Sequence, residues 1–154
     1  MAKFKQILQI EPATELTFHA VPSDKNVTAK LKLMNPSQES ICFKIMVTAP
    51  MVYTIKPNKG IIPPNQSTEI LVTLHSFKYG ENQTYKHKLM VRSMFARGEA
   101  LEDHMDQMWK EISPDAVMGT KLDCRFIQAE RKETLMVSIN TILYTLHLQK
   151  IMEN

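Results

Sequence analysis

Residues 85–95 read YKHKLMVRSMF, and two kinds of side chain alternate along this stretch. Successive side chains of a β-strand leave opposite faces, so the pattern predicts a half-buried strand. The mostly apolar inward set is Tyr85, His87, Leu89, Val91 and Phe95, and the outward set is Lys86, Lys88, Met90, Arg92 and Met94. Ammonium groups attract carboxylates, while methionines and lysine stems cover an aromatic ring. The outward face therefore has the chemistry to bind a ligand that is both acidic and aromatic.

The stretch ICFKIMVTA (41–49) repeats this arrangement. Its inward set is Ile41, Phe43, Ile45 and Val47, and its outward set is Cys42, Lys44, Met46 and Thr48. If the two strands are neighbours, Lys44 and Met46 lie beside Lys88 and Met90. An ordinary solvent-exposed sheet face is the alternative, and the alternation taken alone favours it.

Residues that could catalyse a reaction are present but scattered. The five histidines are dispersed, and the chain contains no HExxH, G-x-S-x-G, P-loop or G-x-G-x-x-G pattern. Asp103 and Asp106, three residues apart, could bind a cation, although a solvated polar helix face is the favoured explanation. We therefore predict that the protein is not an enzyme and that it uses no cofactor and no metal.

Length and charge define the class of protein. A chain of 154 residues predicts one domain, and its net charge of +3 is too small to indicate nucleic-acid binding. The basic face also lacks interleaved exposed aromatic residues for stacking on bases. Cys42 and Cys124 have no metal or redox spacing, and we expect reduced, buried thiols. The N-terminus has no apolar run of signal-peptide length.

The elements that position the outward set are predicted from short alternating runs bounded by turn formers. The expected strands cover residues 5–12, 15–21, 26–35, 41–49, 52–58, 67–76 and 85–95, with a closing strand at 121–127. An apolar stripe predicts a short helix over 100–112, which Pro114 ends. The fold class is therefore all-β, an antiparallel β-sandwich with one short helix.

The tail, residues 128–154, follows a charged break. Residues 135–149 are uncharged yet too short and too polar to span a bilayer. Apolar residues recur with both helical and strand spacing, and we interpret the tail as a packed or partner-seeking amphipathic segment, with helix slightly favoured over strand. No heptad pattern lasts long enough for a coiled coil.

The chain resembles the major sperm protein (MSP) domain, in particular that of the VAMP-associated proteins (VAP) of the endoplasmic reticulum (ER). The resemblance covers residues 1–127. It rests on MAKFKQILQIEP, ELTF, LKLMNPS, ICFKIMVTAP, YTIKPNKGII, KHKLMVRSMFA, MWKEISPDAVM and KLDCRF. It implies a seven-stranded immunoglobulin-like antiparallel β-sandwich. It also implies a non-enzymatic adaptor for FFAT motifs, which carry phenylalanines behind an acidic or phosphorylated tract and recruit their proteins to the ER and to membrane contact sites.

The resemblance also implies the peptide-binding residues, which are Lys44, Met46, Val47, Thr48, Lys88, Met90 and Lys121. The lysines would hold the acidic tract, and Met90 with the lysine stems would receive a phenylalanine. Members of the family usually read KVKTTAP where this chain reads KIMVTAP, so Met46 replaces a lysine and Val47 a threonine. We therefore expect binding to survive in a weakened or retuned form.

The expected partners are FFAT-containing proteins and, by homo- or hetero-oligomerisation, VAP relatives. The family continues into a coiled coil and a membrane anchor, whereas the tail at 128–154 diverges. We expect a cytoplasmic location, facing or associated with the ER. If the chain is complete, we expect a soluble protein that could capture FFAT partners without tethering them to the ER. The alternative is a structural MSP-like protein that self-associates through its sheet edges and has lost FFAT binding.

Overall fold

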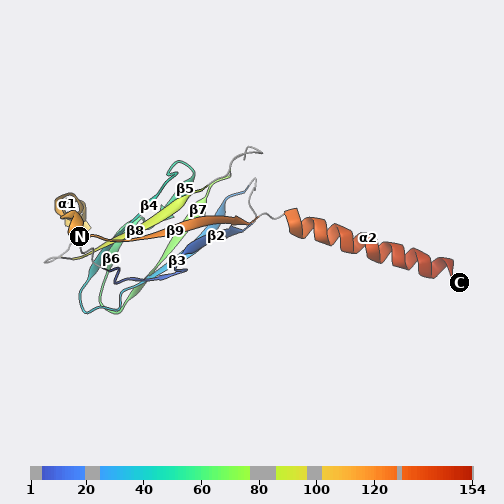
Figure 1. Cartoon of the computed structure of the whole chain (residues 1–154), viewed down its shortest axis with the longest axis horizontal. Helices are drawn as coiled ribbons and strands as arrows, with labels where there is room; N and C mark the ends of the chain where they lie inside the picture. The colour runs from blue at the N-terminus through green and yellow to red at the C-terminus, as the bar shows by residue number, and fades with distance from the viewer. Residues whose placement is uncertain (1–4, 20–24, 77–85, 97–101, 128–129, 154) are drawn as a thin grey trace.

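Alternating apolar side chains build two β-sheets with one core between them (Figure 1). The computed structural model describes residues 5–19, 25–76, 86–96, 102–127 and 130–153. The four-stranded sheet has the spatial order β1 (Gln9–Glu11), β3 (Val27–Met34), β7 (Ser67–Leu74) and β5 (Tyr53–Lys56). The five-stranded sheet has the order β2 (Glu15–His19), β9 (Met118–Ile127), β8 (Lys88–Phe95), β4 (Ile41–Val47) and β6 (Lys59–Ile62).

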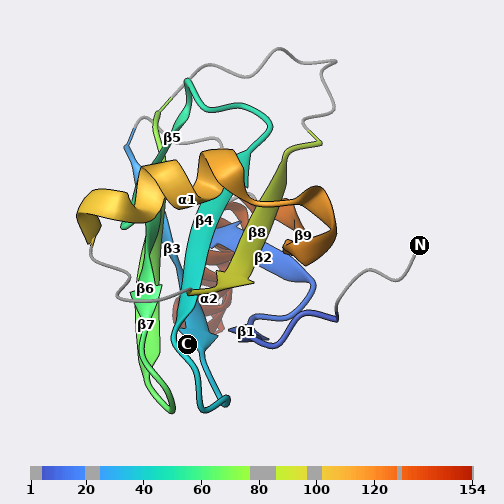
Figure 2. The same ribbon diagram turned by 90° about the vertical axis from the view of Figure 1, so that its left-hand side faces the viewer.

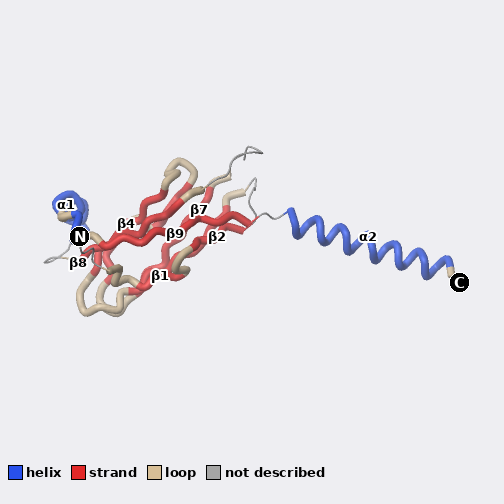
Figure 3. The backbone as a smooth tube through the Cα atoms, viewed as in Figure 1, coloured by secondary structure: helices blue, strands red, loops and turns tan. Residues whose placement is uncertain are grey.

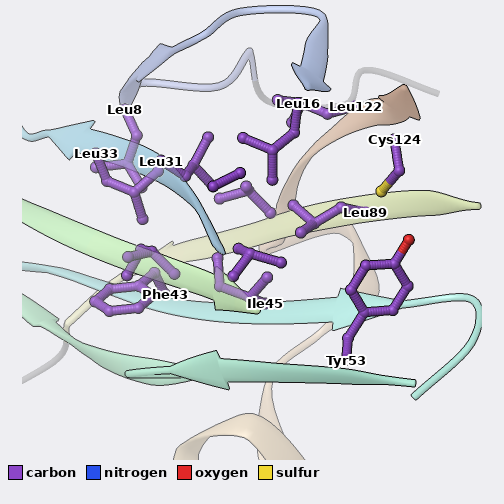
Figure 4. Close-up of a cluster of buried hydrophobic side chains, with 14 of the residues drawn as sticks. Leu8, Leu16, Leu31, Leu33, Phe43, Ile45, Tyr53, Leu89, Leu122 and Cys124 are labelled. Carbon is purple, nitrogen blue, oxygen red and sulfur yellow. The ribbon is translucent and has the colours of Figure 1, made fainter. Parts of the chain in front are cut away.

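The core is built from every second residue of the central strands, as the alternation predicts. On β3, Leu31 and Leu33 are fully buried, whereas Lys30, which directly precedes Leu31, is exposed. Phe43 of β4 and Leu89 of β8 meet these side chains from the five-stranded sheet (Figure 4). One continuous apolar layer therefore holds the two sheets together and leaves the outer face of each available for other contacts.

The expectation of seven strands is corrected, because the described residues form nine. The stretch expected as one strand over 52–58 leads into two short strands in different sheets. β5 pairs with β7, and after Pro57 and Asn58 the chain crosses over to pair β6 with β4. The four residues of β6, KGII, are too few for alternation to reveal a strand.

The expectation of a wholly antiparallel arrangement is also corrected. β2 pairs with β9 in parallel, with Glu15 beside Asp123 and His19 beside Ile127. Period-2 alternation reports which face a side chain occupies and carries no information on the direction of the neighbouring strand. On β9, the expected inward set is confirmed, since Leu122 and Cys124 are buried and Phe126 is half-buried.

The short helix expected over 100–112 is α1 (Met105–Glu111), preceded by a 3-10 turn at Glu102–His104. Residues 100 and 101 lie outside the described part of the chain. Ile112 and Ser113 have extended backbone conformations. The ring of a proline clashes with a helical conformation of the residue before it. The helix therefore ends ahead of Pro114, as predicted. Its apolar stripe begins with the buried Met105.

The tail forms a second helix, α2 (Glu130–Met152), which extends away from the sheets (Figures 1 and 3). Residues 139–152 are exposed, among them large apolar side chains. At about 3.6 residues per turn, they fall on two opposite sides of the helix. One side carries Ile139, Ile142, Leu143 and Leu146, and the other carries Tyr144, Leu148, Ile151 and Met152. Within the described residues, neither helix has the length and apolarity that crossing a bilayer requires.

An aromatic cluster closes the core near the start of β8. The rings of Phe18, Tyr53, His87 and Phe126 contact one another edge-on or tilted, with centroids 5.4–6.0 Å apart. The Tyr53 hydroxyl and His87 Nδ1 are hydrogen-bonded at 2.8 Å. Burial lowers the pKa of His87 below its usual value of 6.5, because a charged imidazole loses hydration there.

This pKa shift predicts that acid weakens the fold. The unfolded chain binds a proton at His87 near pH 6.5, whereas the folded chain does so only at lower pH. The free energy of unfolding should therefore fall as the pH decreases through 6.5 towards the folded pKa. Urea denaturation at pH 7.5 and pH 5.5 measures the effect, which should shrink in His87→Gln. An unchanged pH dependence in that variant would contradict the assignment, and His147→Gln on exposed α2 is the control.

A second prediction concerns the contact between β4 and β6. Gly60 is the register partner of Phe43, and a Cβ atom at Gly60 would lie 2.8 Å from the buried ring. Gly60→Ala should cost about 1–3 kcal/mol, because the ring has to shift within a packed core. Gly119→Ala is the matched control, since a Cβ there meets nothing within 4 Å. Equal urea midpoints for the two variants would show that the core yields freely around Phe43.

Candidate functional site

The outer face of the five-stranded sheet brings together most of the residues singled out in the sequence. β8 lies between β4 and β9, and its register places Met46 opposite Met90 and Met90 opposite Lys121. Neighbouring strands are about 4.8 Å apart, so these three residues form one row across three strands. We call Lys121, Met90 and Met46 the central row.

Cations flank the central row on both sides. Towards α1, Lys44 is opposite Arg92, and Lys59 of β6 continues this second row. On the other side Lys88 lies beside Thr48, whose backbone N–H donates to the Lys88 carbonyl at 3.0 Å. The Lys88 N–H donates to Thr48 Oγ1, also at 3.0 Å. Thr48 therefore extends the β4–β8 ladder by one pair, and its hydroxyl proton remains available to a ligand.

Val47 is the one predicted site residue that lies elsewhere. It belongs to the inward parity of β4, opposite Leu89, and it packs against the hydrophobic core. The outer face thus collects Lys44, Met46, Thr48, Lys88, Met90 and Lys121, while Val47 supports the strand from behind. Lys88 and Lys121 are exposed, Met46 is 46% exposed, and Met90 and Lys44 are half-buried.

The expectation that the whole outward set faces solvent is corrected at one end of the strand. Met94 of β8 is fully buried, and so is its register partner Cys42. Met94 and Phe95 share the lining of a cavity of about 360 Å³ with Met108 and Ile112 from the α1 region. Figure 2 shows α1 lying across this end of the five-stranded sheet. Cys42 and Cys124 are both free and buried, as expected.

Polar contacts hold α1 against the sheet. Lys59 Nζ lies 2.5 Å from Asp106 Oδ1, and this contact lowers the pKa of the Asp106 carboxyl below its ordinary value. The Arg92 guanidinium lies over the Trp109 ring, with Cζ 5.7 Å from the centroid, and its Nη1 is 3.9 Å from Met46 Sδ. Sequence reasoning put Arg92 on the correct face but missed its contact with Trp109, because no local pattern links β8 to α1.

Four cations of the outer face make no ion pair among the residues that the structure describes. Among the described residues, the ion pairs are Lys30–Glu69, Lys59–Asp106 and Arg125–Glu15. None of them involves the cations at 44, 88, 92 or 121. The same part of the chain contains no cluster of three His, Cys, Asp or Glu side chains arranged to hold a metal ion. The face is thus suited to attracting an anionic ligand.

Comparisons with known proteins identify the family. The family model of the MSP (major sperm protein) domain matches residues 7–114. The chain is 42% identical over 146 residues to human vesicle-associated membrane protein-associated protein B/C, covering 94% of this chain and 59% of that protein. It is 44% identical over 126 residues to the vesicle-associated membrane protein/synaptobrevin-binding protein of Aplysia californica, covering 82% of this chain and 48% of that protein.

A solved structure shows the same fold. SSP-19, an MSP-domain protein of Caenorhabditis elegans, superposes with a TM-score of 0.59 at 21% identity, covering 77% of this chain and 99% of that one. The chain spans about half of the length of the curated relatives it matches, 59% of the human protein and 48% of the Aplysia californica protein. The family-model match includes β4 and β8, which carry Met46 and Met90, and ends before β9, which carries Lys121.

The burial of Met94 under α1 predicts opposite results for two substitutions on one strand. Met94→Asp should lower the free energy of unfolding by about 3 kcal/mol or more, because it places a charge in a closed apolar site. Met90→Asp, on the half-buried central row, should cost about 1 kcal/mol or less. Urea denaturation measures both, and similar losses would mean that α1 does not close the Met94 end.

Proposed function

The chain belongs to the MSP (major sperm protein) domain family, and from this premise we propose that it is a non-enzymatic adaptor for FFAT-type peptides. The central row and its flanking cations form the proposed binding face. The ligand is a segment with phenylalanines and an acidic or phosphorylated tract. The observation that carries the proposal is the alignment of Met46, Met90 and Lys121 across three neighbouring strands.

Each part of this ligand has a counterpart on the face. Met46 and Met90 present thioethers, which pack well against an aromatic ring, and the stem of Lys121 extends the same apolar strip. Lys88 on one side of the strip and Lys44 on the other make no ion pair within the described residues. An acidic tract on either side of a phenylalanine would thus meet positive charge.

The exposure of the face argues for moderate affinity. Lys88 and Lys121 are exposed, and a charged contact in water contributes little, about 1 kcal/mol or less. A phosphate would gain more than a carboxylate, because it carries more charge and more acceptor oxygens. Lysine holds either group as a point charge, which tolerates several binding geometries. We therefore expect dissociation constants in the micromolar range.

The cellular role follows from the ligand and from the relatives. We propose that the protein acts at the cytoplasmic face of the ER, where VAP relatives recruit FFAT-bearing partners to membrane contact sites. Homo- or hetero-oligomers with those relatives would change how many peptide faces act together. The exposed apolar side chains of α2 are a surface that such association would cover.

Peptide titration tests the proposed function. A fluorescent FFAT peptide, in acidic and phosphorylated versions, should bind the wild-type chain saturably at micromolar concentration. Lys88→Asp combined with Met90→Asp should weaken binding at least about tenfold, because it places two carboxylates in the path of an acidic ligand.

The matched control is Thr28→Asp with Lys32→Asp, which makes the same change in net charge on the exposed face of β3 in the other sheet. Equal affinity in the Lys88→Asp/Met90→Asp variant would locate the peptide site elsewhere. If the wild-type chain binds neither peptide, the proposed function is refuted and the self-associating structural protein is favoured. Sizing chromatography detects such self-association.

A further inference from the structure

We propose that Arg92 is a specificity-determining residue of this face and that its guanidinium takes an oxyanion, carboxylate or phosphate, of the bound peptide. The inference rests on the proposed function and adds to it a residue that the sequence-based site did not include. Four observations carry it: the place of Arg92 beside the central row, the open space next to it, the contacts that hold it, and the absence of an ion pair to it among the described residues.

Arg92 extends the peptide face by one row towards α1. It follows Met90 by two residues on β8, so the two side chains leave the same face about 7 Å apart. Its register partners are Lys44 on β4 and Gly119 on β9. An extended peptide lying along the central row therefore reaches Arg92 within a few residues.

Space for a ligand lies on the β9 side of Arg92. Gly119 is exposed, and a Cβ atom built on it meets nothing within 4 Å. The chain therefore leaves a gap in the side-chain layer on the β9 side of the Arg92 position. On the other side Lys44 is half-buried and supplies a second cation. Gly119, Arg92 and Lys44 thus lie in one row, with a cation on one flank of Arg92 and a residue without a side chain on the other.

The guanidinium is held in place before a ligand arrives. Its Cζ lies over the Trp109 ring, 5.7 Å from the centroid, and its Nη1 contacts Met46 Sδ at 3.9 Å. The contact with Met46 uses only Nη1 and a thioether is a weak acceptor, so these two contacts leave most of the five N–H donors for a ligand. A side chain already confined in this way loses less entropy when it binds. A carboxylate or phosphate can accept two N–H bonds from it at once.

The charge of Arg92 calls for an anion. Within the described structure, Lys59 is paired with Asp106, whereas no carboxylate lies within ion-pair distance of Arg92. Lys44 sits directly opposite Arg92 in the ladder, and like charges in that position repel. An oxyanion bound between them would relieve this repulsion as well as gain its own contacts.

The contact between Arg92 and Met46 changes the loss of affinity expected from a methionine at position 46. A methionine at this position removes a cation from β4, but the Arg92 guanidinium lies against its sulfur and supplies a positive charge at the same spot. A lysine introduced at position 46 and the native Arg92 are thus alternative sources of one charge. The introduced lysine should therefore matter only when Arg92 is absent.

A double-mutant cycle tests the inference, with affinity for the acidic and the phosphorylated FFAT peptides as the readout. Arg92→Gln should weaken binding about fivefold to tenfold, a loss typical of one charge-assisted contact on a partly exposed face. Met46→Lys should change affinity less than about twofold in the wild-type chain, yet restore most of the loss in Arg92→Gln. Arg92→Lys should recover only part, because an ammonium lacks the planar fork.

Two controls separate this effect from damage to the fold. Arg125→Gln removes the same charge from the far end of the same outer face and should leave affinity unchanged. Urea denaturation should show Arg92→Gln to be folded. Trp109 is the sole tryptophan, so an anion bound to the Arg92 guanidinium over its ring should alter its fluorescence in the wild-type chain and much less in Arg92→Gln.

The outcomes distinguish this inference from the proposed function. If the wild-type chain binds peptide, Lys88→Asp/Met90→Asp abolishes binding and Arg92→Gln changes nothing, the role of Arg92 is refuted while the peptide face stands. Equal losses in Arg92→Gln and Arg125→Gln would show only a general charge effect and would also refute it. If the wild-type chain binds neither peptide, both the proposed function and this inference fail.

Discussion

The antiparallel ladder between β4 and β8 is the constraint on which the rest of this structure depends. Its register sets Ile45 opposite Val91 on the core side and Met46 opposite Met90 on the outer side. A slip of one residue would turn every apolar side chain of one strand outwards, so burial of the core fixes the register firmly. The same register fixes the positions of the outward residues, because each of them lies between two inward residues that the core holds in place. The central row is thus positioned by packing that takes place on the opposite side of the sheet.

Helix α1 divides the outer face into two regions with different roles. Where its apolar side chains meet the sheet, Met94 and Cys42 are buried and serve stability. Beyond its edge, Met46, Met90 and the cations remain accessible. The boundary is formed by Arg92, whose guanidinium contacts Trp109 on one side and Met46 on the other. One short helix therefore determines how far the accessible part of the outer face extends along strands that look uniform in sequence.

In the tail, by contrast with the two sheets, the chain is helical although the apolar side chains of its described part from residue 139 are not buried against other elements. α2 is helical, yet its apolar side chains from Ile139 onwards remain exposed on two opposite sides. In the two-sheet domain, by contrast, even a polar residue can be fully buried when its bonds are met. The Asn35 amide donates to the carbonyls of Glu39, Ile62 and Pro63, and its Oδ1 accepts from Ser37. The bonds of Asn35 are thus met within the two-sheet domain, whereas the apolar side chains of α2 from Ile139 onwards remain exposed.

The sequence alone determined the all-β class, the inward and outward parity of β4, β8 and β9, the end of α1 before Pro114 and the family resemblance. These follow from period-2 alternation and from proline geometry, which are local properties of the chain. Only the tertiary structure decided that β2 lies parallel to β9, that β6 is a separate strand, that α1 covers the buried Met94, and that the Arg92 guanidinium lies over the Trp109 ring. Each of these depends on which distant segments meet, and an alternating pattern specifies a face without specifying what covers it.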